Sequence, residues 1–272
     1  MAETLRIFVT TCRPMWRVEK ALEYTVHKYC TPPFEVTFLR SGDPEWLTNV
    51  DMGIPHQDKE AIKKAGCWNI GRDHPRPYTG EGWATPFTCF RFTIPELCGF
   101  EGRAIHMDAD FIVQNDLREI FEMEMTHPIM SPHHRTDFML IDCSRMAEMQ
   151  MMGMWPSIEE MKVSGDNIEI YRQKLQSYMF IGDAPGEWES WDGKDLTEKS
   201  YSIHYTEMRT QPWKPYPEYF DYPLYPDKNA GYIFWEEYAE ALEAEARGEI
   251  VLSAKDQTPS DETPLSKKKN RV

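Results

Sequence analysis

The sequence lacks any uninterrupted apolar run of the roughly 18 or more residues that a membrane-spanning helix needs. Basic residues are few beside acidic ones, 30 against 45, which gives a formal net charge of −15. A surface with this charge repels phosphate backbones, so nucleic acid is not the expected partner. We expect a soluble protein whose contact with a membrane is at most peripheral.

The six cysteines include no Cys-x-x-Cys pair, and the opening residues MAETLRIFVTTC lack the basic and then apolar segments of a secretory leader. Reduced thiols and a cytoplasmic location are therefore expected. With 272 residues the chain can bury a substantial core. We expect one domain over residues 1–252, with an irregular insertion at 40–83 and a helix at 228–248, and a disordered polar and basic tail at 253–272.

The N-terminal residues alternate between strand and helix patterns. Residues 5–10 and 34–39 are short β-rich runs, and residues 18–29 repeat apolar side chains on one helical face. Strand, helix and strand at this spacing predict a βαβ unit and a parallel sheet. Ligands of such sheets bind beyond the carboxyl ends of the strands. The residues expected at that edge are Thr10, Thr11, Cys12 and Arg13.

Further patterns predict a helix over 88–97, a helix that begins at Asp116, and strands at 128–132, 138–141 and 201–203. Glu119 stands three residues after Asp116, as in a capping box. An apolar stripe predicts that the C-terminal helix is amphipathic, ends at Gly248 and packs against the domain. The stripe consists of Trp235, Tyr238, Ala239, Leu242 and Ala246.

The most informative stretch is RAIHMDADFIVQNDLREIF, residues 103–121, in which a short apolar strand ends in Asp108 and Asp110. Side chains at i and i+2 of an extended backbone point to the same side, about 6 to 7 Å apart. Two carboxylates placed in this way suit Mg²⁺ or Mn²⁺. Taken alone, however, the motif is better explained as a solvated turn in a protein with 45 acidic residues.

The flanks of the acidic pair resemble a known family. Residues 90–121, FRFTIPELCGFEGRAIHMDADFIVQNDLREIF, are similar to the core of glycosyltransferase family 8, the glycogenin and galactosyltransferase group. In that family an R-L-x-I-P-E-L helix precedes a strand ending in L-D-A-D, and a D-L-x-E-L-F helix follows. Three further segments resemble the family in order: FMLIDCSRM (138–146), GDNIEIYRQKL (165–175) and IHYTEMRTQPWKP (203–215).

The resemblance implies an α/β fold of the GT-A (Rossmann-like) type, in which a mostly parallel central sheet flanked by helices binds a nucleotide sugar. It also implies a metal-dependent, retaining transfer of a sugar from a UDP-sugar. Asp108, Ala109 and Asp110 would contact the donor, and the two aspartates with His204 would hold Mn²⁺ or Mg²⁺. Such a metal offsets the charge that grows on the leaving diphosphate. Arg91 matches the family's cation that reaches the donor.

In the family, the nucleotide base binds at the edge of the sheet where Thr10, Thr11, Cys12 and Arg13 are expected here. The His204 segment departs from the family pattern, because it is one residue longer, lacks a glycine and has Gln211 where a phosphate-binding lysine usually stands. A diphosphate needs more than one cationic partner, so Arg209 or Lys214 would replace that lysine.

Three further positions follow from the resemblance. Asp137, in RTDFMLID, stands at a family glycine and would contact the donor sugar. Asp166 and Asn167 match an Asp-Gln pair near the anomeric carbon and are the expected catalytic residues, although a helix N-cap explains Asp166 equally well. The segment EWESWD, residues 187–192, resembles a W-N-x-L-D turn whose tryptophans could stack on an acceptor sugar or be buried.

Alternative functions remain open beside glycosyl transfer. Water could be the acceptor, which would make the protein a nucleotide-sugar hydrolase. The missing lysine and glycine would also suit a nucleotide-sugar or glycan-binding protein without turnover. Transfer of a sugar to a nucleotide or nucleic acid is disfavoured by the acidic charge. The expected acceptors are otherwise a glycan, a lipid-linked glycan or another small molecule, and loops outside the motifs would select among them.

Overall fold

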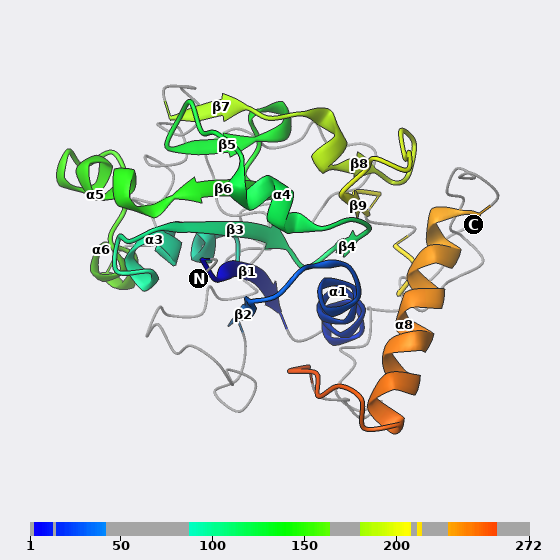
Figure 1. Ribbon diagram of the computed structural model, residues 1–272. Coiled ribbons are helices and arrows are strands. Elements are labelled where there is room, and N and C mark those ends of the chain that lie inside the picture. The colour runs from blue at the N-terminus through cyan, green and yellow to red at the C-terminus, as the bar shows by residue number, and fades with distance from the viewer. Residues whose placement is uncertain are drawn as a thin grey trace, which may run out of the picture.

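The computed structural model of the chain describes residues 3–12, 15–41, 87–163, 180–207, 211–213 and 228–254 (Figure 1). A central six-stranded sheet runs through them in the order β2-β1-β3-β6-β5-β7. Every neighbouring pair is parallel except the two that involve β6. The strands are β1 (Leu5–Cys12), β2 (Phe34–Ser41), β3 (Arg103–Asp108), β5 (Ile129–Ser131), β6 (Phe138–Asp142) and β7 (Ile181–Asp183).

A smaller sheet adjoins the central one and has the order β4-β9-β8. Its strands are β4 (Phe111–Val113), β9 (Ser202–His204) and β8 (Ser190–Trp191). The apolar residues after the acidic pair form the strand β4, which belongs to a different sheet from β3. Asp108 and Asp110 lie at the crossing between the two sheets.

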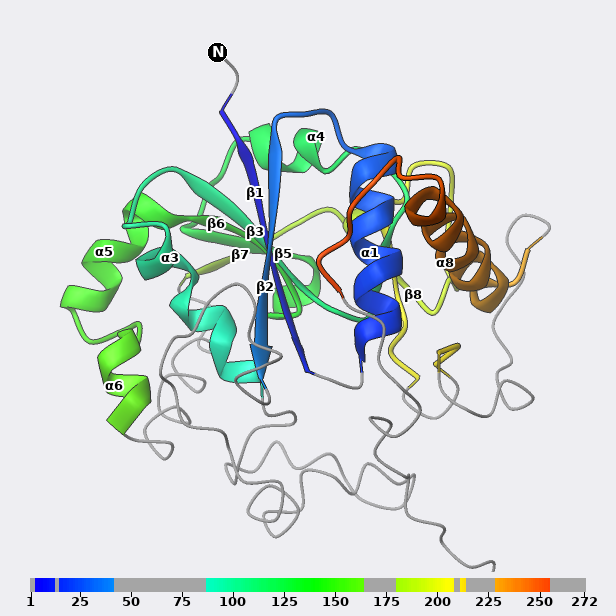
Figure 2. The ribbon, with the colours of Figure 1, turned by 90° about the horizontal axis from the view of Figure 1, so that it is seen from below.

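Helices cover both faces of the central sheet, as the view along it shows (Figure 2). On one face lie α1 (Trp16–Tyr29) and α8 (Ala230–Ala246), and on the other lie α3 (Ile94–Leu97), α5 (Cys143–Met151) and α6 (Ile158–Val163). The helix α4 (Leu117–Glu122) follows β4, and short 3-10 helices occur at η2 (Thr88–Thr93), η3 (Pro132–His134) and η4 (Gly186–Trp188). None of the described helices is long and apolar enough to cross a bilayer.

The predicted βαβ unit is confirmed, since β1 and β2 pair in parallel and α1 connects them. The apolar stripe of α1 is fully buried against the sheet, at Val18, Ala21, Leu22 and Val26. The segment predicted as one helix over 88–97 instead divides into η2 and the single turn of α3.

The start of α4 confirms one predicted cap and corrects another. Asp116 caps the helix, with its carboxylate accepting from the Arg118 backbone N–H at 2.9 Å. Glu119, however, does not complete a capping box. Its carboxylate accepts from the Tyr201 hydroxyl and so ties α4 to the strand that leads into the site.

The predicted stripe of α8 is correct only in part, at Trp235 and Tyr238, which are half-buried and pack against the core. Leu242, Ala239 and Ala246 are exposed, whereas the buried side includes Ile233, Phe234 and Glu237. The reason is a tertiary ion pair: Glu237 accepts from Lys28 and Tyr29 of α1, which places a charged residue on the packed side. The prediction that α8 packs back onto the domain is confirmed.

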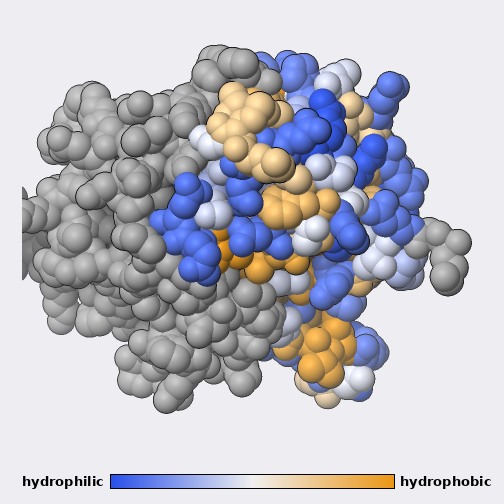
Figure 3. Space-filling view, turned by 90° about the vertical axis from the view of Figure 1, so that its left-hand side faces the viewer, coloured by the Kyte–Doolittle hydropathy of each residue, from blue (hydrophilic) through white to orange (hydrophobic). Residues whose placement is uncertain are grey.

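The face that carries α5 and α6 has apolar side chains interspersed with hydrophilic ones (Figure 3). Met151 and Met152, at the end of α5, are exposed, and Met146 of the same helix is buried. The buried methionine joins Trp155 and η2 side chains in the second core cluster, beneath the face of the sheet opposite α1. The sheet that carries the acidic pair is therefore supported from both sides.

Candidate active site

The backbone of the acidic pair is tied to three different strands or strand ends. The Asp108 N–H donates to the Asp137 carbonyl at 2.9 Å, and the Ala109 N–H donates to the Thr10 carbonyl at 3.1 Å. The Asp110 carbonyl accepts from the Tyr205 N–H at 2.9 Å. These main-chain bonds bring together the end of β1, the start of β6 and the end of β9.

Asp108 is held by a buried cation and a hydroxyl. Arg91 donates to both carboxylate oxygens at 2.7 and 2.9 Å, and Thr10 donates to one of them at 2.7 Å. Arg91 is 4% exposed and also donates to the backbone carbonyl and hydroxyl of Thr136. Burial raises the pKa of Asp108 to about 6; Arg91 opposes the rise, and the nearby carboxylates of Asp110 and Asp137 add to it.

His204 stands between two sets of carboxylates. Its Nε2 lies 3.4 Å from Asp110 Oδ1, and its Nδ1 is hydrogen-bonded to Glu189 Oε1 and lies 3.9 Å from Asp137 Oδ2. Burial acts to lower the pKa of His204, but Asp110, Glu189 and Asp137 together raise it well above its usual value. The imidazole is therefore protonated near neutral pH in the absence of a competing cation.

The described residues contain one group with three potential ligand atoms within 4.8 Å of one another: Asp137, Glu189 and His204. It shares His204 with the predicted set but contains neither Asp108 nor Asp110. Two buried oxygens of this group, Asp137 Oδ1 and Glu189 Oε2, have no hydrogen-bond partner. Buried carboxylate oxygens without a partner, beside an imidazole, indicate that a divalent cation next to His204 would be stabilised in this region.

Of the other residues singled out from the sequence, some lie in or near the site and some lie outside the described part of the chain. Gln211 lies in the site, where its amide donates to Asp110 Oδ2 at 3.2 Å and to the Tyr205 carbonyl at 2.8 Å. Thr11 is turned to α1, where it donates to Glu19. Ala109 is buried, and the backbone of Cys12 ends β1 beside Ser41. Outside the described residues lie Arg13, Asp166, Asn167, Arg209 and Lys214.

Sequence reasoning missed two charged residues of the site. Arg135 donates to Asp137 Oδ2 from its Nε at 2.8 Å, and its guanidinium lies over the Trp191 ring at 4.8 Å. Glu189 bonds His204, as described above. The available signal was the alternation in the sequence EWESW, which on extended backbone turns Glu189 and Trp191 to the same side.

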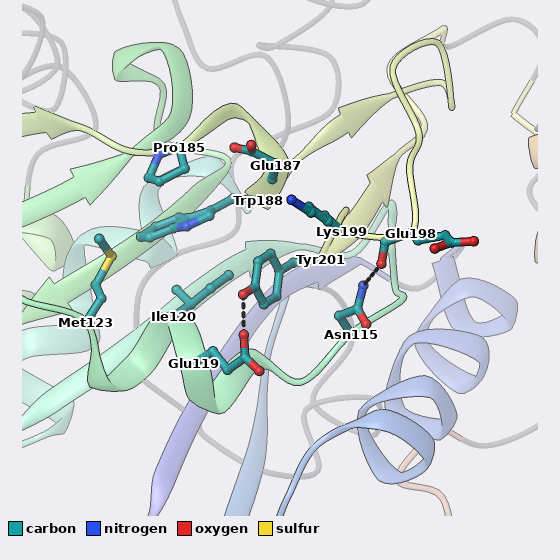
Figure 4. A pocket seen from close by; sticks show the side chains of 10 residues that line it. All are labelled: Asn115, Glu119, Ile120, Met123, Pro185, Glu187, Trp188, Glu198, Lys199 and Tyr201. Carbon is teal, nitrogen blue, oxygen red and sulfur yellow. Dashed lines mark hydrogen bonds between the residues drawn. The ribbon is translucent and has the colours of Figure 1, made fainter.

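Trp188, which directly precedes Glu189, is buried and not exposed for stacking on a sugar. It is 2% exposed and packs against Phe138 with ring centroids 5.6 Å apart. Trp188 also lines a cavity of about 580 Å³, together with Glu119, Ile120 and Pro185 (Figure 4). Glu187 and Lys199 line this cavity too, beside the Tyr201 to Glu119 hydrogen bond. Glu187 thus borders this cavity and Glu189 does not, and none of the predicted metal ligands lines it.

No protein-family model and no curated protein matches the sequence. Several solved structures are similar to the fold. The chain is 15% identical to the glycosyltransferase GlyE of Streptococcus pneumoniae TIGR4, with a TM-score of 0.54 over 94% of this chain and 66% of GlyE. It is 12% identical to the bifunctional glycosyltransferase WbbM, with a TM-score of 0.55 over 91% of this chain and 52% of WbbM.

The galactosyltransferase LgtC, solved in complex with donor and acceptor sugar analogues, gives a TM-score of 0.56 at 12% identity. That similarity covers 90% of this chain and 100% of LgtC. The chain therefore spans all of LgtC, but only about half of WbbM and just under two thirds of GlyE. Similarity at sequence identities this low concerns the backbone fold and not the substrates. The chain has the α/β GT-A fold of the glycosyltransferases, as its sequence predicts.

Proposed function

We propose that the chain is a metal-dependent, retaining glycosyltransferase that moves a sugar from a UDP-sugar to an acceptor. One observation carries the proposal: His204, distant in sequence, faces Asp110 at 3.4 Å at the crossing between the two sheets. A solvated turn, the competing explanation of the acidic pair, would not hold Asp108, which is 18% exposed, against the buried side chains of Arg91 and His106. The GT-A fold supports the same function.

In this proposal Asp108, Asp110 and His204 hold Mn²⁺ or Mg²⁺. When bound, the cation would supply positive charge that stabilises the departing UDP. Arg91 keeps the Asp108 carboxylate in place and adds a second positive charge beside it. Asp137 has a buried, unpartnered oxygen that can accept a hydroxyl of the donor sugar.

The remaining roles are proposed from the family resemblance. Asp166 and Asn167 would act at the anomeric carbon, and Arg209 or Lys214 would bind the diphosphate. The residues from Thr10 to Arg13 would border the nucleotide, since Thr10, Thr11 and Cys12 form the carboxyl end of β1. Thr11 would do so through its backbone, because its side chain donates to Glu19. We further propose a cytoplasmic enzyme whose acceptor is a glycan, a lipid-linked glycan or another small molecule.

The test is a screen of UDP-sugars with Mn²⁺ that measures UDP release, followed by the Asp110→Asn variant. We expect this variant to lose metal-dependent release by at least about 100-fold while keeping its fold, because it removes a charged ligand of the metal. Asp183→Asn is the matched control, since Asp183 is an exposed aspartate at the end of β7. Full activity of Asp110→Asn would refute the proposed metal site.

A second candidate function is nucleotide-sugar binding without turnover, and the contacts of Gln211 favour it. The amide of this buried residue is bonded to Asp110 at the position where the family has a phosphate-binding lysine. That candidate predicts UDP binding by calorimetry and no sugar release over hours. Product analysis with and without acceptors separates transfer from the third candidate, hydrolysis.

A further inference from the structure

We propose that Glu189 is a positioning residue, which fixes the orientation and tautomer of His204 so that its Nε2 binds the metal. This inference rests on the metal site of the proposed function. Glu189 is absent from the set of ligands that the family resemblance implies, and its role follows from its contacts.

Glu189 is placed by the small sheet. It directly precedes β8, where Trp191 stands opposite His204 in the parallel pairing of β8 with β9. Its side chain is fully buried. One carboxylate oxygen, Oε1, accepts both from His204 Nδ1 and from the Trp191 indole N–H. The indole bond fixes the carboxylate, and the carboxylate in turn fixes the imidazole.

Phe111 fixes the plane of the same ring. It stands opposite His204 in the pairing of β4 with β9, and the two rings stack with centroids 4.0 Å apart and an interplanar angle of 16°. With the plane set by Phe111 and Nδ1 held by Glu189, Nε2 can point only toward Asp110. The imidazole is thus oriented by two contacts that lie outside the predicted ligand set.

The hydrogen bond also selects the tautomer. A neutral imidazole has one N–H and one lone pair, so an N–H donated from Nδ1 to Glu189 leaves the lone pair on Nε2. A carboxylate in this second position raises the basicity of the ligating nitrogen, and its loss typically costs about 10- to 100-fold in metal affinity. A cation held instead by Asp137, Glu189 and Nδ1 would require the opposite tautomer and would displace the shared Oε1 from two donors.

The experiment is a Mn²⁺ titration of the full chain without donor, with free Mn²⁺ followed by electron paramagnetic resonance. We expect Glu189→Ala to weaken binding by about 10- to 100-fold. Glu189→Gln should fall between this variant and the wild type, because its amide oxygen still accepts the Nδ1 proton. The matched control is Glu187→Gln, which removes the same charge from the same turn on the exposed side. Its affinity should equal that of the wild type.

Pulsed electron paramagnetic resonance of the bound Mn²⁺ gives a second measurement, which would not change if Glu189 had only a structural role. Nitrogen coupling from His204 should be present in the wild type and lost in Glu189→Ala at saturating Mn²⁺, while the carboxylate-bound ion remains. If Glu189→Ala does not fold, Glu189→Gln alone carries the test through its affinity and its nitrogen coupling.

Two results would overturn the positioning role. The first is wild-type affinity and nitrogen coupling in both Glu189 variants. The second is complete loss of binding in Glu189→Gln together with retained binding in Asp110→Asn, which would make Glu189 a ligand. If Mn²⁺ binding depends on Glu189 as expected but no UDP-sugar is turned over, the proposed function fails and the positioning role stands.

Discussion

At the scale of single residues, the site concentrates buried charges that are balanced only in part. Four carboxylates face three basic side chains: Asp108, Asp110, Asp137 and Glu189 against Arg91, Arg135 and His204. The balance is incomplete, as the raised pKa of Asp108 and the unpartnered oxygens of Asp137 and Glu189 indicate. A bound cation would relieve this excess of negative charge.

This arrangement predicts that Mn²⁺ binds more tightly as the pH rises from 6 to 8 and that binding releases protons. The pKa of Asp108 is raised to about 6, so this carboxyl is partly protonated at pH 6. The pKa of His204 is also raised, so the imidazolium must lose its Nε2 proton before it can bind. The two raised pKa values change metal affinity in the same direction with pH, because each group binds metal only when it is deprotonated.

The measurement is calorimetry of the Mn²⁺ titration in two buffers of different ionisation enthalpy, at pH 6 and pH 8. More protons should be released at pH 6 than at pH 8, because both groups bind more protons in the free protein at the lower pH. Glu187→Gln serves again as the control. An affinity that does not change with pH would contradict the assignment of His204 as a ligand.

At the scale of elements, α8 supports the site through the residue that follows His204. Phe234 of α8 is fully buried among Tyr205 and Trp213, and the Tyr205 hydroxyl donates to the Ala230 carbonyl at 2.6 Å. We expect Phe234→Ala to lower the free energy of unfolding by about 3 to 5 kcal/mol, measured by urea denaturation. Tyr232→Ala on the exposed side of α8 should change it by less than about 0.5 kcal/mol. Equal effects of the two changes would contradict this packing.

The elements that could be predicted from sequence are those whose burial follows from a local repeat. The apolar stripe of α1 predicts the register correctly, because its positions from Val18 to Val26 are fully buried. The charged side chains of Glu19, Lys20 and Glu23 on the same helix are buried as well, and the stripe does not predict them. The stripe of α8 misleads in part, because Lys28 of α1 brings Glu237 to the buried side and no local pattern encodes that partner. For the same reason, the apolar run of β4 does not indicate the sheet to which it belongs, because its partner β9 lies far along the chain.

The same limit applies to the site. Asp108, Asp110 and His204 could be proposed from short motifs with distinctive flanks. Arg135 could not, because its role depends on the start of β6. The alternation in EWESW turns Glu189 toward Trp191, but only the pairing of β8 with β9 brings both residues to His204. Asp137 was predicted as a sugar contact, and its bond to Arg135 and its nearness to His204 emerge only from the fold.

At the scale of the whole molecule, the formal charge of −15 predicts weak binding to duplex DNA at physiological ionic strength. Fluorescence anisotropy of a labelled duplex should show no saturable binding at about 150 mM salt, a concentration at which the Debye length is about 8 Å. Lowering the salt provides the control for residual attraction to basic segments. Tight binding with a steep salt dependence would instead favour a nucleic-acid acceptor.

The main-chain ties of the acidic pair have a consequence for how such proteins diverge. Asp108, Ala109 and Asp110 are fixed to β1, β6 and the end of β9 by backbone N–H and carbonyl groups, which every residue other than proline possesses. These backbone hydrogen bonds therefore require little of the identity of the residues that form them. Side chains around the acidic pair can be replaced one at a time while the backbone keeps its arrangement. An inherited geometry of this kind can persist after most of the ancestral amino acids have been replaced.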